Sequence, residues 1–442
     1  MQIIKGKCAD ISSEGKGIIK TVYGVIFVDS LLLEEEAEIE VTYARAGISY
    51  GKIRRLITKS KDRISPPCPI STACGGCTFQ NASYEYELIY KKRKVSEALR
   101  KIGHIDFPVN DVIGMEVPSH YRNKIQVPFA RNGKNIIYGF YKANTHKIIP
   151  VKGCNIEDAR AEPILSSIAY LMSSMKIEPY NEDNRSGIIR HLLIRTSYHY
   201  DEVMVVLVTN IDSFPSRNNF VKELVKKHPS IKTVVQNINS RDTNVILGEK
   251  ERVLYGPGFI KDDILGLRFN ISSKSFFQVN PIQTEKLYKT AINCANLTQN
   301  DVLLDAYSGV GTIGLICASK VKKVLSIEVV KEAVDNAISN AKNNHINNIE
   351  FINADCTEYI HNNLPKVDVV IMDPPRKGST PEFLKALLEI KPSRIVYISC
   401  EPSTLARDLT YLINDYDIKL VQPVDMFPRG YHVETITMLN HK

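Results

Sequence analysis

The chain has 442 residues, of which 43% are hydrophobic and 24% charged, as expected for a globular protein of two to four domains. This composition excludes disordered, collagen-like and simple repeat chains, and no apolar stretch approaches the ~20 residues that cross a bilayer. The first residues, MQIIKGKCAD, contain no apolar signal region. We therefore expect a cytoplasmic protein with no membrane partner.

The net charge is unevenly distributed along the chain. Lysine and arginine outnumber aspartate and glutamate by 57 to 49, a formal net charge of +8. Residues 61–154 carry 15 basic and 7 acidic side chains, which accounts for the whole excess. A local basic excess is typical of a surface that binds a polyanion. The run KKRK at residues 91–94 is as typical of a solvated helix face, so both interpretations stay open.

The first 265 residues predict a barrel, a helix and a mixed α/β region, in that order. Alternating apolar residues interrupted by glycines predict a small β-barrel over residues 1–60. An amphipathic helix with a basic face is expected over residues 84–101. Residues 118–265 have a mostly strand-like pattern, with helical stretches near 157–175 and 217–227. That pattern indicates a mixed α/β region.

From about residue 297 the pattern changes to strands that alternate with helices. This alternation predicts a parallel sheet with helices on both faces. Two last strands, IKLVQPVDMF and ETITML, are expected to form an antiparallel edge pair joined by a short turn. We therefore divide the chain into a barrel (1–60), a central α/β region (61–265) and a doubly wound α/β region (266–442).

Nine cysteines in a chain with no secretory signal favour metal binding or catalysis over a disulfide framework. Three of them lie in the proline- and glycine-containing segment CPISTACGGC, with the spacing Cys68-x5-Cys74-x2-Cys77. Cys154 is the natural candidate for a fourth ligand. By spacing alone, four thiolates can hold either zinc or a [4Fe–4S] cluster.

A glycine-rich segment, DAYSGVGTIG at 305–314, lies between a predicted strand and a predicted helix. Glycines let a ligand approach the backbone closely, and the helix N-terminus offers free N–H groups. The glycine spacing that begins at Gly309 also matches the dinucleotide fingerprint, which is a weak signal when it stands alone. A nicotinamide cofactor therefore competes with other nucleotides at this point.

Acidic residues follow the next three strands of this region. Glu328 ends the second strand, where a carboxylate can accept both hydroxyls of an adenosine ribose. Asp355 follows the third strand and Asp373 the fourth. This series resembles the class I S-adenosylmethionine-dependent methyltransferases, a Rossmann-like fold in which the acid after the third strand lies near the adenine. The resemblance favours S-adenosylmethionine over a nicotinamide cofactor.

Two further residues suggest a reaction. Cys400 ends the fifth strand, at the edge of the sheet that faces the ligand, although a cysteine there is often only packing. A thiolate that adds to C6 of uracil makes C5 nucleophilic. A base must then remove the proton from C5 before the thiolate can leave. Glu434, just before the last strand, is the candidate base.

Five motifs in order resemble the RNA uracil-C5 methyltransferase family: SFFQVN at 275–280, DAYSGVGTIGL at 305–315, DPPRKG at 373–378, SCEPSTLARDL at 399–409 and FPRGYHVE at 427–434. The resemblance implies that Cys400 is the nucleophile and Glu434 the base. It implies cofactor contacts from Gln278, Tyr307, Glu328 and Asp373, and it places Phe276 and Phe277 near the flipped base. The sequence departs from the family pattern at Glu401, where asparagine is usual, and at Arg429-Gly430.

The same resemblance implies the rest of the organisation. Family members with this cysteine spacing hold a [4Fe–4S] cluster, which favours iron over zinc for Cys68, Cys74, Cys77 and Cys154. The barrel resembles a TRAM domain, an RNA-binding relative of the OB-like barrels, and we expect the basic helix to be docked on the catalytic region. Members with both features mostly act on 23S rRNA, so rRNA is the expected partner and tRNA the second choice. The enzyme is expected to be a monomer.

Two rival functions remain at this stage. Asp373-Pro374-Pro375 also occurs in enzymes that methylate exocyclic amino groups of nucleic acids, which need no cysteine. A non-catalytic RNA-binding factor would share the basic segment and the barrel. A covalent adduct with fluorouracil-substituted RNA distinguishes the thiolate mechanism from amino-group methylation. A non-catalytic factor predicts that Cys400→Ser has no chemical phenotype.

Overall fold

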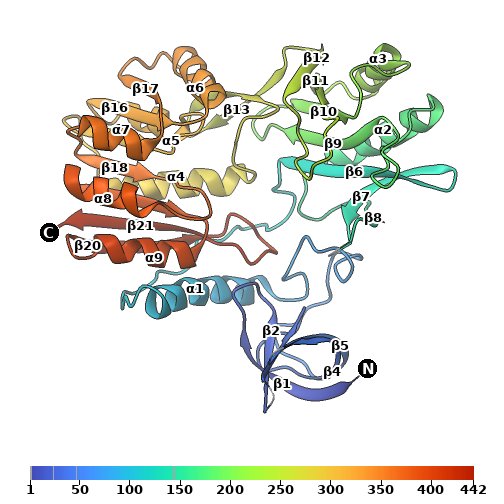
Figure 1. Ribbon diagram of the computed structural model, residues 1–442, viewed down its shortest axis with the longest axis horizontal. Coiled ribbons are helices and arrows are strands. Elements are labelled where there is room, and N and C mark those ends of the chain that lie inside the picture. Colours follow the sequence, from blue (N-terminus) through green and yellow to red (C-terminus); the bar gives the residue numbers. More distant parts are fainter. Residues whose placement is uncertain (1, 23, 46, 143–144) are drawn as a thin grey trace.

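The computed structural model describes residues 2–22, 24–45, 47–142 and 145–442 (Figure 1). Its first part is a closed barrel of five strands in the order β1-β2-β3-β5-β4. The strands are β1 (Ile3–Ile11), β2 (Gly17–Thr21), β3 (Gly24–Val28), β4 (Glu36–Arg45) and β5 (Ile48–Thr58). Alternate residues such as Ile19, Ile26 and Ile39 point inward and are buried, as the alternating pattern predicts.

The basic helix α1 (Tyr84–Lys101) lies between the barrel and the C-terminal region (Figure 1). Ser83 caps its N-terminus by accepting a hydrogen bond from the backbone N–H of Tyr86. On one side Tyr90 packs into the barrel core, and on the other Val95 and Leu99 pack into the core of the C-terminal sheet. The expected docking of this helix on the catalytic region is therefore confirmed.

The central region is a seven-stranded sheet in the order β12-β11-β10-β9-β6-β7-β8, with the two expected helices beside it. Its elements are β6 (Lys124–Asn132), β7 (Asn135–Tyr141), β8 (Ile148–Pro150), α2 (Ala161–Ser174), β9 (Ile189–Thr196), β10 (Val203–Thr209), α3 (Arg217–Lys227), β11 (Ile231–Ile238) and β12 (Lys250–Tyr255). Strands β9 and β10 are buried along their whole length, because α2 and α3 cover one face and the C-terminal half covers the other.

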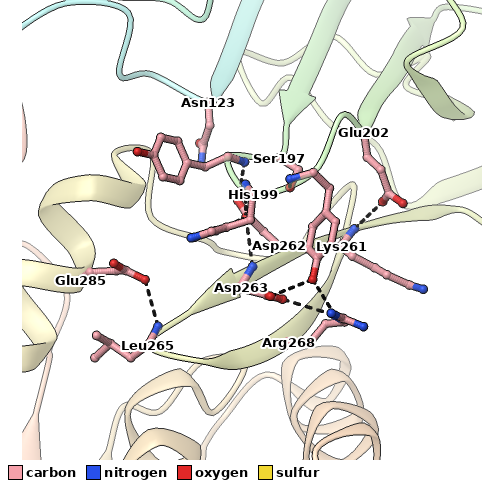
Figure 2. Close-up of polar contacts among 12 residues, drawn as sticks. Asn123, Ser197, His199, Glu202, Lys261, Asp262, Asp263, Leu265, Arg268 and Glu285 are labelled. Carbon is pink, nitrogen blue, oxygen red and sulfur yellow. Dashed lines mark hydrogen bonds and ion pairs between the residues drawn. The ribbon is translucent and has the colours of Figure 1, made fainter.

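A hairpin of β13 (Phe259–Ile264) and β14 (Leu267–Ser272) joins the central sheet to the C-terminal region. Figure 2 shows its polar contacts with the turn between β9 and β10. Asp262 is fully buried and accepts hydrogen bonds from the backbone N–H groups of Tyr198 and His199, at 2.9 and 3.1 Å. Arg268 donates to the Tyr200 hydroxyl at 2.9 Å and to Asp263 at 3.3 Å.

The C-terminal region is a seven-stranded sheet in the order β17-β16-β15-β18-β19-β21-β20, with helices on both faces (Figure 1). Its elements are α4 (Pro281–Ala295), β15 (Val302–Ala306), α5 (Thr312–Ala318), β16 (Lys323–Glu328), α6 (Lys331–Asn343), β17 (Ile349–Asn353), α7 (Cys356–Asn363), β18 (Val369–Met372), α8 (Pro381–Ile390), β19 (Arg394–Ser399), α9 (Pro402–Leu412), β20 (Tyr416–Val424) and β21 (Glu434–His441). The first five strands are parallel and β21 is antiparallel. This is the class I, Rossmann-like arrangement that the sequence predicts. No helix among the described residues is long and apolar enough to cross a membrane.

Candidate active site

The glycine-rich loop connects β15 to α5 in a backbone conformation that suits glycine. Gly309 and Gly311 have φ values of +56° and +75°. The backbone N–H of Gly309 donates to Glu328 Oε2 at 2.9 Å, so the loop and the second strand end are joined. A Cβ atom at Gly309 would meet nothing within 4 Å, which leaves open space above this residue.

A buried carboxylate shapes this loop from below. Asp305, 1% exposed at the end of β15, accepts a hydrogen bond from the backbone N–H of Gly314 at 2.9 Å. Burial raises the pKa of Asp305 to about 7, and that hydrogen bond opposes the shift. At Gly314 a Cβ atom would come within 2.7 Å of the Asp305 carboxylate, so no larger residue fits. Asp305 therefore organises the loop rather than facing a ligand.

The surroundings of the loop offer polar groups and an aromatic ring to a ligand. Ser308 Oγ is buried and finds no hydrogen-bond partner among the described residues, so a polar ligand atom can satisfy it. Glu328 accepts from the backbone N–H groups of Gly309 and Val330 at 2.9 Å each. The ring of Tyr307 packs against Phe383 with centroids 5.2 Å apart, and its hydroxyl lies 3.4 Å from Ser379 Oγ.

Asp355 caps a helix, a role that the sequence alone does not predict. It is the N-cap of α7 and accepts hydrogen bonds from the backbone N–H groups of Thr357 and Glu358 at 2.9 and 3.1 Å. The side chain is exposed at the strand end next to Glu328. A contact with the adenine stays a prediction for this residue.

Strand register brings three predicted residues together. Ser399 of β19 pairs with Thr435 of β21, so Cys400 and Glu434 follow at neighbouring positions. Asp373 follows β18, which runs parallel to β19 on its other side. All three therefore lie at the edge of the sheet where the parallel strands end.

Burial and mutual repulsion dominate the electrostatics of this group. Burial raises the pKa of the Cys400 thiol to about 12, with further increases from Glu434 and Asp373, while Arg376 opposes the shift. Burial also raises the pKa of Glu434, and the nearby Asp373 raises it further. Burial raises the pKa of Asp373 as well. In the free protein the thiol is therefore protonated, and the two carboxyl groups hold protons more tightly than exposed ones.

The segment after Asp373 is fixed by a buried aspartate of α9. Asp408 accepts hydrogen bonds from the backbone N–H of Ser379 at 2.8 Å and from the Tyr397 hydroxyl at 2.6 Å. Arg376 projects from the same segment and lies 2.7 Å from a ring nitrogen of His432. Burial, then Arg376, lowers the pKa of His432 to about 4, so its ring is neutral at pH 7.

The segment that leads to Glu434, residues 425–433, is held from outside the C-terminal sheet. Lys91 of α1 is fully buried and donates to Glu87 Oε1 and to Asp425 Oδ1, both at 2.6 Å. It also donates to the carbonyl oxygen of Phe427 at 3.2 Å. Glu87 Oε1 accepts the backbone N–H of Arg429 at 2.8 Å. The sequence alone does not predict this network, since Lys91 belongs to a run that is typical of a basic surface.

The SFFQVN motif divides into a buried and an exposed part. Phe276 is 71% exposed, whereas Phe277 is 5% exposed and packs against Phe269 with centroids 6.3 Å apart. Phe277 is therefore a core residue, and of the two expected aromatic rings Phe276 is the one available for stacking. Gln278 bonds to the hydroxyl of Tyr288, a buried residue of α4 near the charges of Asp373 and Glu434.

The four cysteines predicted as metal ligands are half-buried and free. Burial raises the pKa of the Cys77 thiol, and the nearby Cys74 and Cys68 raise it further. Burial also raises the pKa of Cys154 to about 12, with a smaller contribution from Cys77. The thiols thus influence one another electrostatically, but no three histidine, cysteine or acidic side chains of the described chain are close enough to hold a metal ion. The segment is joined to the site, because the backbone N–H of Thr78 donates to the carbonyl oxygen of Arg429 at 2.7 Å.

The family described as tRNA (uracil-5-)-methyltransferase matches residues 83–442. The chain belongs to the RNA uracil-C5 methyltransferase family. An uncharacterised RNA methyltransferase of Oceanobacillus iheyensis is 41% identical over 98% of this chain and 95% of its own length. Another, from Staphylococcus aureus, is 40% identical over 99% of this chain and 98% of its own length.

Among solved structures, the tRNA (uracil-54, C5)-methyltransferase of Pyrococcus abyssi in complex with S-adenosyl-L-homocysteine superimposes with a TM-score of 0.79. It is 26% identical, and the match covers 98% of this chain and 99% of that one. The predicted family, fold class and enzyme class of this RNA uracil-C5 methyltransferase are thereby confirmed, with S-adenosylmethionine as the methyl donor.

Proposed function

We propose that this RNA uracil-C5 methyltransferase works through a covalent bond between Cys400 and C6 of the target uracil. S-adenosylmethionine supplies an electrophilic methyl group. The thiol of Cys400 gives its proton to water and the sulfur adds to C6, so that the C5–C6 double bond becomes an enolate with a nucleophilic C5. C5 then takes the methyl group, and S-adenosylhomocysteine is the leaving group. The neighbouring positions of Cys400 and Glu434, set by the register of β19 and β21, are the observation that supports this mechanism.

Glu434 is the proposed base. After C5 has accepted the methyl group, Glu434 takes the proton from C5, the double bond re-forms and the C6–sulfur bond breaks. The raised pKa of Glu434, caused by burial and then by Asp373, makes its carboxylate a stronger proton acceptor than an exposed glutamate. Gln278, Tyr307, Gly309, Glu328, Asp355 and Asp373 are the residues that we propose for cofactor binding.

The test of the mechanism uses Glu434→Gln and Cys400→Ala with labelled methyl donor and substrate RNA on a denaturing gel. Glu434→Gln should accumulate a methylated protein–RNA complex, because the C5 proton cannot leave. Cys400→Ala should form no complex and no product while it still binds S-adenosylmethionine. A folded Glu434→Gln protein that turns over at the wild-type rate would assign the base to another group, and Asp425 or His432 would be tested next.

We propose a uridine of 23S rRNA as the target. The support is the combination of a TRAM-like barrel with the cysteine spacing Cys68-x5-Cys74-x2-Cys77. A uridine of tRNA is the second candidate, because the superimposed Pyrococcus abyssi enzyme acts on tRNA. Mapping methyluridine in both RNAs from cells that lack the gene decides between them: the site that loses its methyl group is the target. We also propose that the enzyme acts as a monomer.

We also propose that Cys68, Cys74, Cys77 and Cys154 hold a [4Fe–4S] cluster with a structural role. The support is the sequence spacing, together with the electrostatic influence that the thiols exert on one another. A cluster here would fix the segment whose Thr78 is bonded to Arg429. It would thereby also help to position residues 425–433, which lead to Glu434. Anaerobically purified protein should contain iron, and Cys77→Ala should lose it. Stoichiometric zinc without iron would contradict the cluster and favour the zinc alternative.

A further inference from the structure

Two cations face each other across neighbouring strands of the central sheet. Lys124 of β6 and Arg195 of β9 are directly paired in the antiparallel register. Like charges in such a position repel and destabilise a sheet unless something compensates them. Arg122 lies two residues before Lys124, so it projects from the same face of the extended chain.

No carboxylate compensates this pair within the residues that the structure describes. Arg195 is 3% exposed; it donates through Nη2 to the carbonyl oxygen of Ser275 at 2.5 Å, and its Nε has no partner there. Lys124 has no hydrogen bond or ion pair of its side chain within the same residues. Arg122 donates to the carbonyl oxygen of Lys124 at 3.1 Å.

Positive charge dominates the electrostatics of this site, because no described carboxylate acts on Lys124 or Arg195. Burial lowers the pKa of Lys124 to about 8, and the charges of Arg195 and Arg122 lower it further. Burial lowers the pKa of Arg195 to about 10. Glu157 is the acidic group that interacts with Arg122, and burial raises its own pKa to about 7. Removing charges from water without partners costs several kcal/mol for each ion, a cost that a bound anion can offset.

The site adjoins the SFFQVN motif at residues 275–280. Ser275, whose carbonyl oxygen Arg195 binds, precedes the exposed Phe276. Asn123, drawn in Figure 2 and adjacent to Lys124, donates its backbone N–H to the carbonyl oxygen of Val279 at 2.9 Å. Its side chain donates to the carbonyl oxygen of Gln278 at 3.2 Å. The cations therefore border the segment that carries Phe276 and Gln278.

We propose that Lys124 and Arg122, backed by the buried charge of Arg195, bind a phosphodiester group of the RNA backbone next to the target uridine. Lys124 is the contact residue because it is partly exposed, whereas Arg195 is covered and acts through its field and through its bond to Ser275. Such a contact would hold the strand while the target base leaves the stack. This inference rests on RNA as the substrate, and it is independent of which RNA is methylated and of the covalent mechanism.

The test compares Lys124→Met with Lys124→Arg and with Lys226→Met, a control at an exposed position of α3 away from the site. Unmodified 23S rRNA and tRNA transcripts serve as probes, and affinity is measured as a function of salt concentration. Each phosphate contact adds about 0.7–0.9 to the slope of log K against log salt. Lys124→Met should lower the slope by about that amount on the tighter-binding transcript and weaken binding about fourfold to sixfold at 0.15 M salt.

Lys124→Arg should keep most of the slope, and Lys226→Met should keep all of it. Kinetics give a second readout: Lys124→Met should raise the KM for RNA while the KM for S-adenosylmethionine stays unchanged. Replacing single phosphates near the target uridine by neutral methylphosphonates should weaken the wild-type enzyme at one position and leave Lys124→Met unaffected there. A folded Lys124→Met protein with the wild-type salt slope would overturn the proposal, whichever transcript binds.

Discussion

Lys91 and Lys124 are both removed from water, yet they differ in what surrounds them. Lys91 is 0% exposed and sits between two carboxylates, Glu87 and Asp425, with a third acceptor in the carbonyl oxygen of Phe427. Lys124 is partly exposed and faces arginines instead. The environments shift the two pKa values in opposite directions. Burial opposes the charge of Lys91, but Glu87 and Asp425 outweigh it and raise its pKa, whereas every influence on Lys124 lowers its pKa.

Lys91 therefore stabilises the folded chain through its ion pairs, whereas Lys124 is the residue that we propose binds a phosphate. The partners of Lys91 lie within the chain and connect α1 to the segment before Glu434, so its charge is used in the free protein. The buried charge of Lys124 destabilises the free protein, and a bound anion would offset that destabilisation. Loss of the charge should therefore lower the free energy of unfolding at Lys91 and leave it unchanged or raise it at Lys124.

The largest effect should come from Lys91→Met. This change leaves Glu87 and Asp425 buried without a cation, and breaking a buried pair in this way costs about 3–5 kcal/mol. The free energy of unfolding, measured in urea, should fall by that amount, and methyl transfer should fall because residues 425–433 lose their support. Lys92→Met is the matched control: Lys92 pairs with the exposed Asp111, a bond of about 0–1 kcal/mol. Equal losses from both variants would contradict the role assigned to Lys91.

A triple variant tests whether the damage in Lys91→Met comes from stranded charge. Lys91→Met combined with Glu87→Gln and Asp425→Asn removes all three charges and keeps similar volumes. Because replacing a whole buried ion network is often neutral, the triple variant should regain most of the about 3–5 kcal/mol that Lys91→Met loses. Urea unfolding again measures the difference. No recovery would mean that the geometry of the network matters more than its charge.

The sequence predicts the catalytic residues but not the role of Lys91. The positions of Asp373, Cys400 and Glu434 were predictable, because each lies at the end of a strand in a recognisable strand–helix alternation and parallel strands end at one edge. The role of Lys91 was not, because its partner Asp425 is 334 positions away in the sequence and the local spacing to Glu87 is that of a surface pair.

The same limit applies to the central sheet and to the motif before α4. The repulsion between Lys124 and Arg195 appears once β6 and β9 are placed in register, which no local pattern specifies. Phe276 and Phe277 look equivalent in the sequence, and the fold buries the second against Phe269. Burial and pairing between distant segments are thus the information that local periodicity lacks.

The smallest effect concerns the stability of Lys124→Met and its dependence on pH. The pKa of Lys124 is about 8 in the folded chain, below the 10.5 of an unperturbed lysine. Below pH 8 the side chain is protonated in both states, so the full cost of burying its charge is present. Between about pH 8 and 10.5 the unfolded chain binds more protons than the folded one, and stability should rise with pH in this window.

Lys124→Met removes this titration together with the buried charge. Its free energy of unfolding at pH 7 should equal or exceed that of the wild type, in contrast to Lys91→Met. The difference between the two proteins should then shrink as the pH rises from about 8 to 10.5, because the wild-type lysine becomes neutral. Urea titrations at half-unit pH intervals measure this difference. A Lys124→Met variant that is less stable than the wild type at pH 7, with a difference that stays constant between pH 8 and 10.5, would mean that the charge of Lys124 is stabilised within the protein. The contrast between the two lysines would then no longer hold.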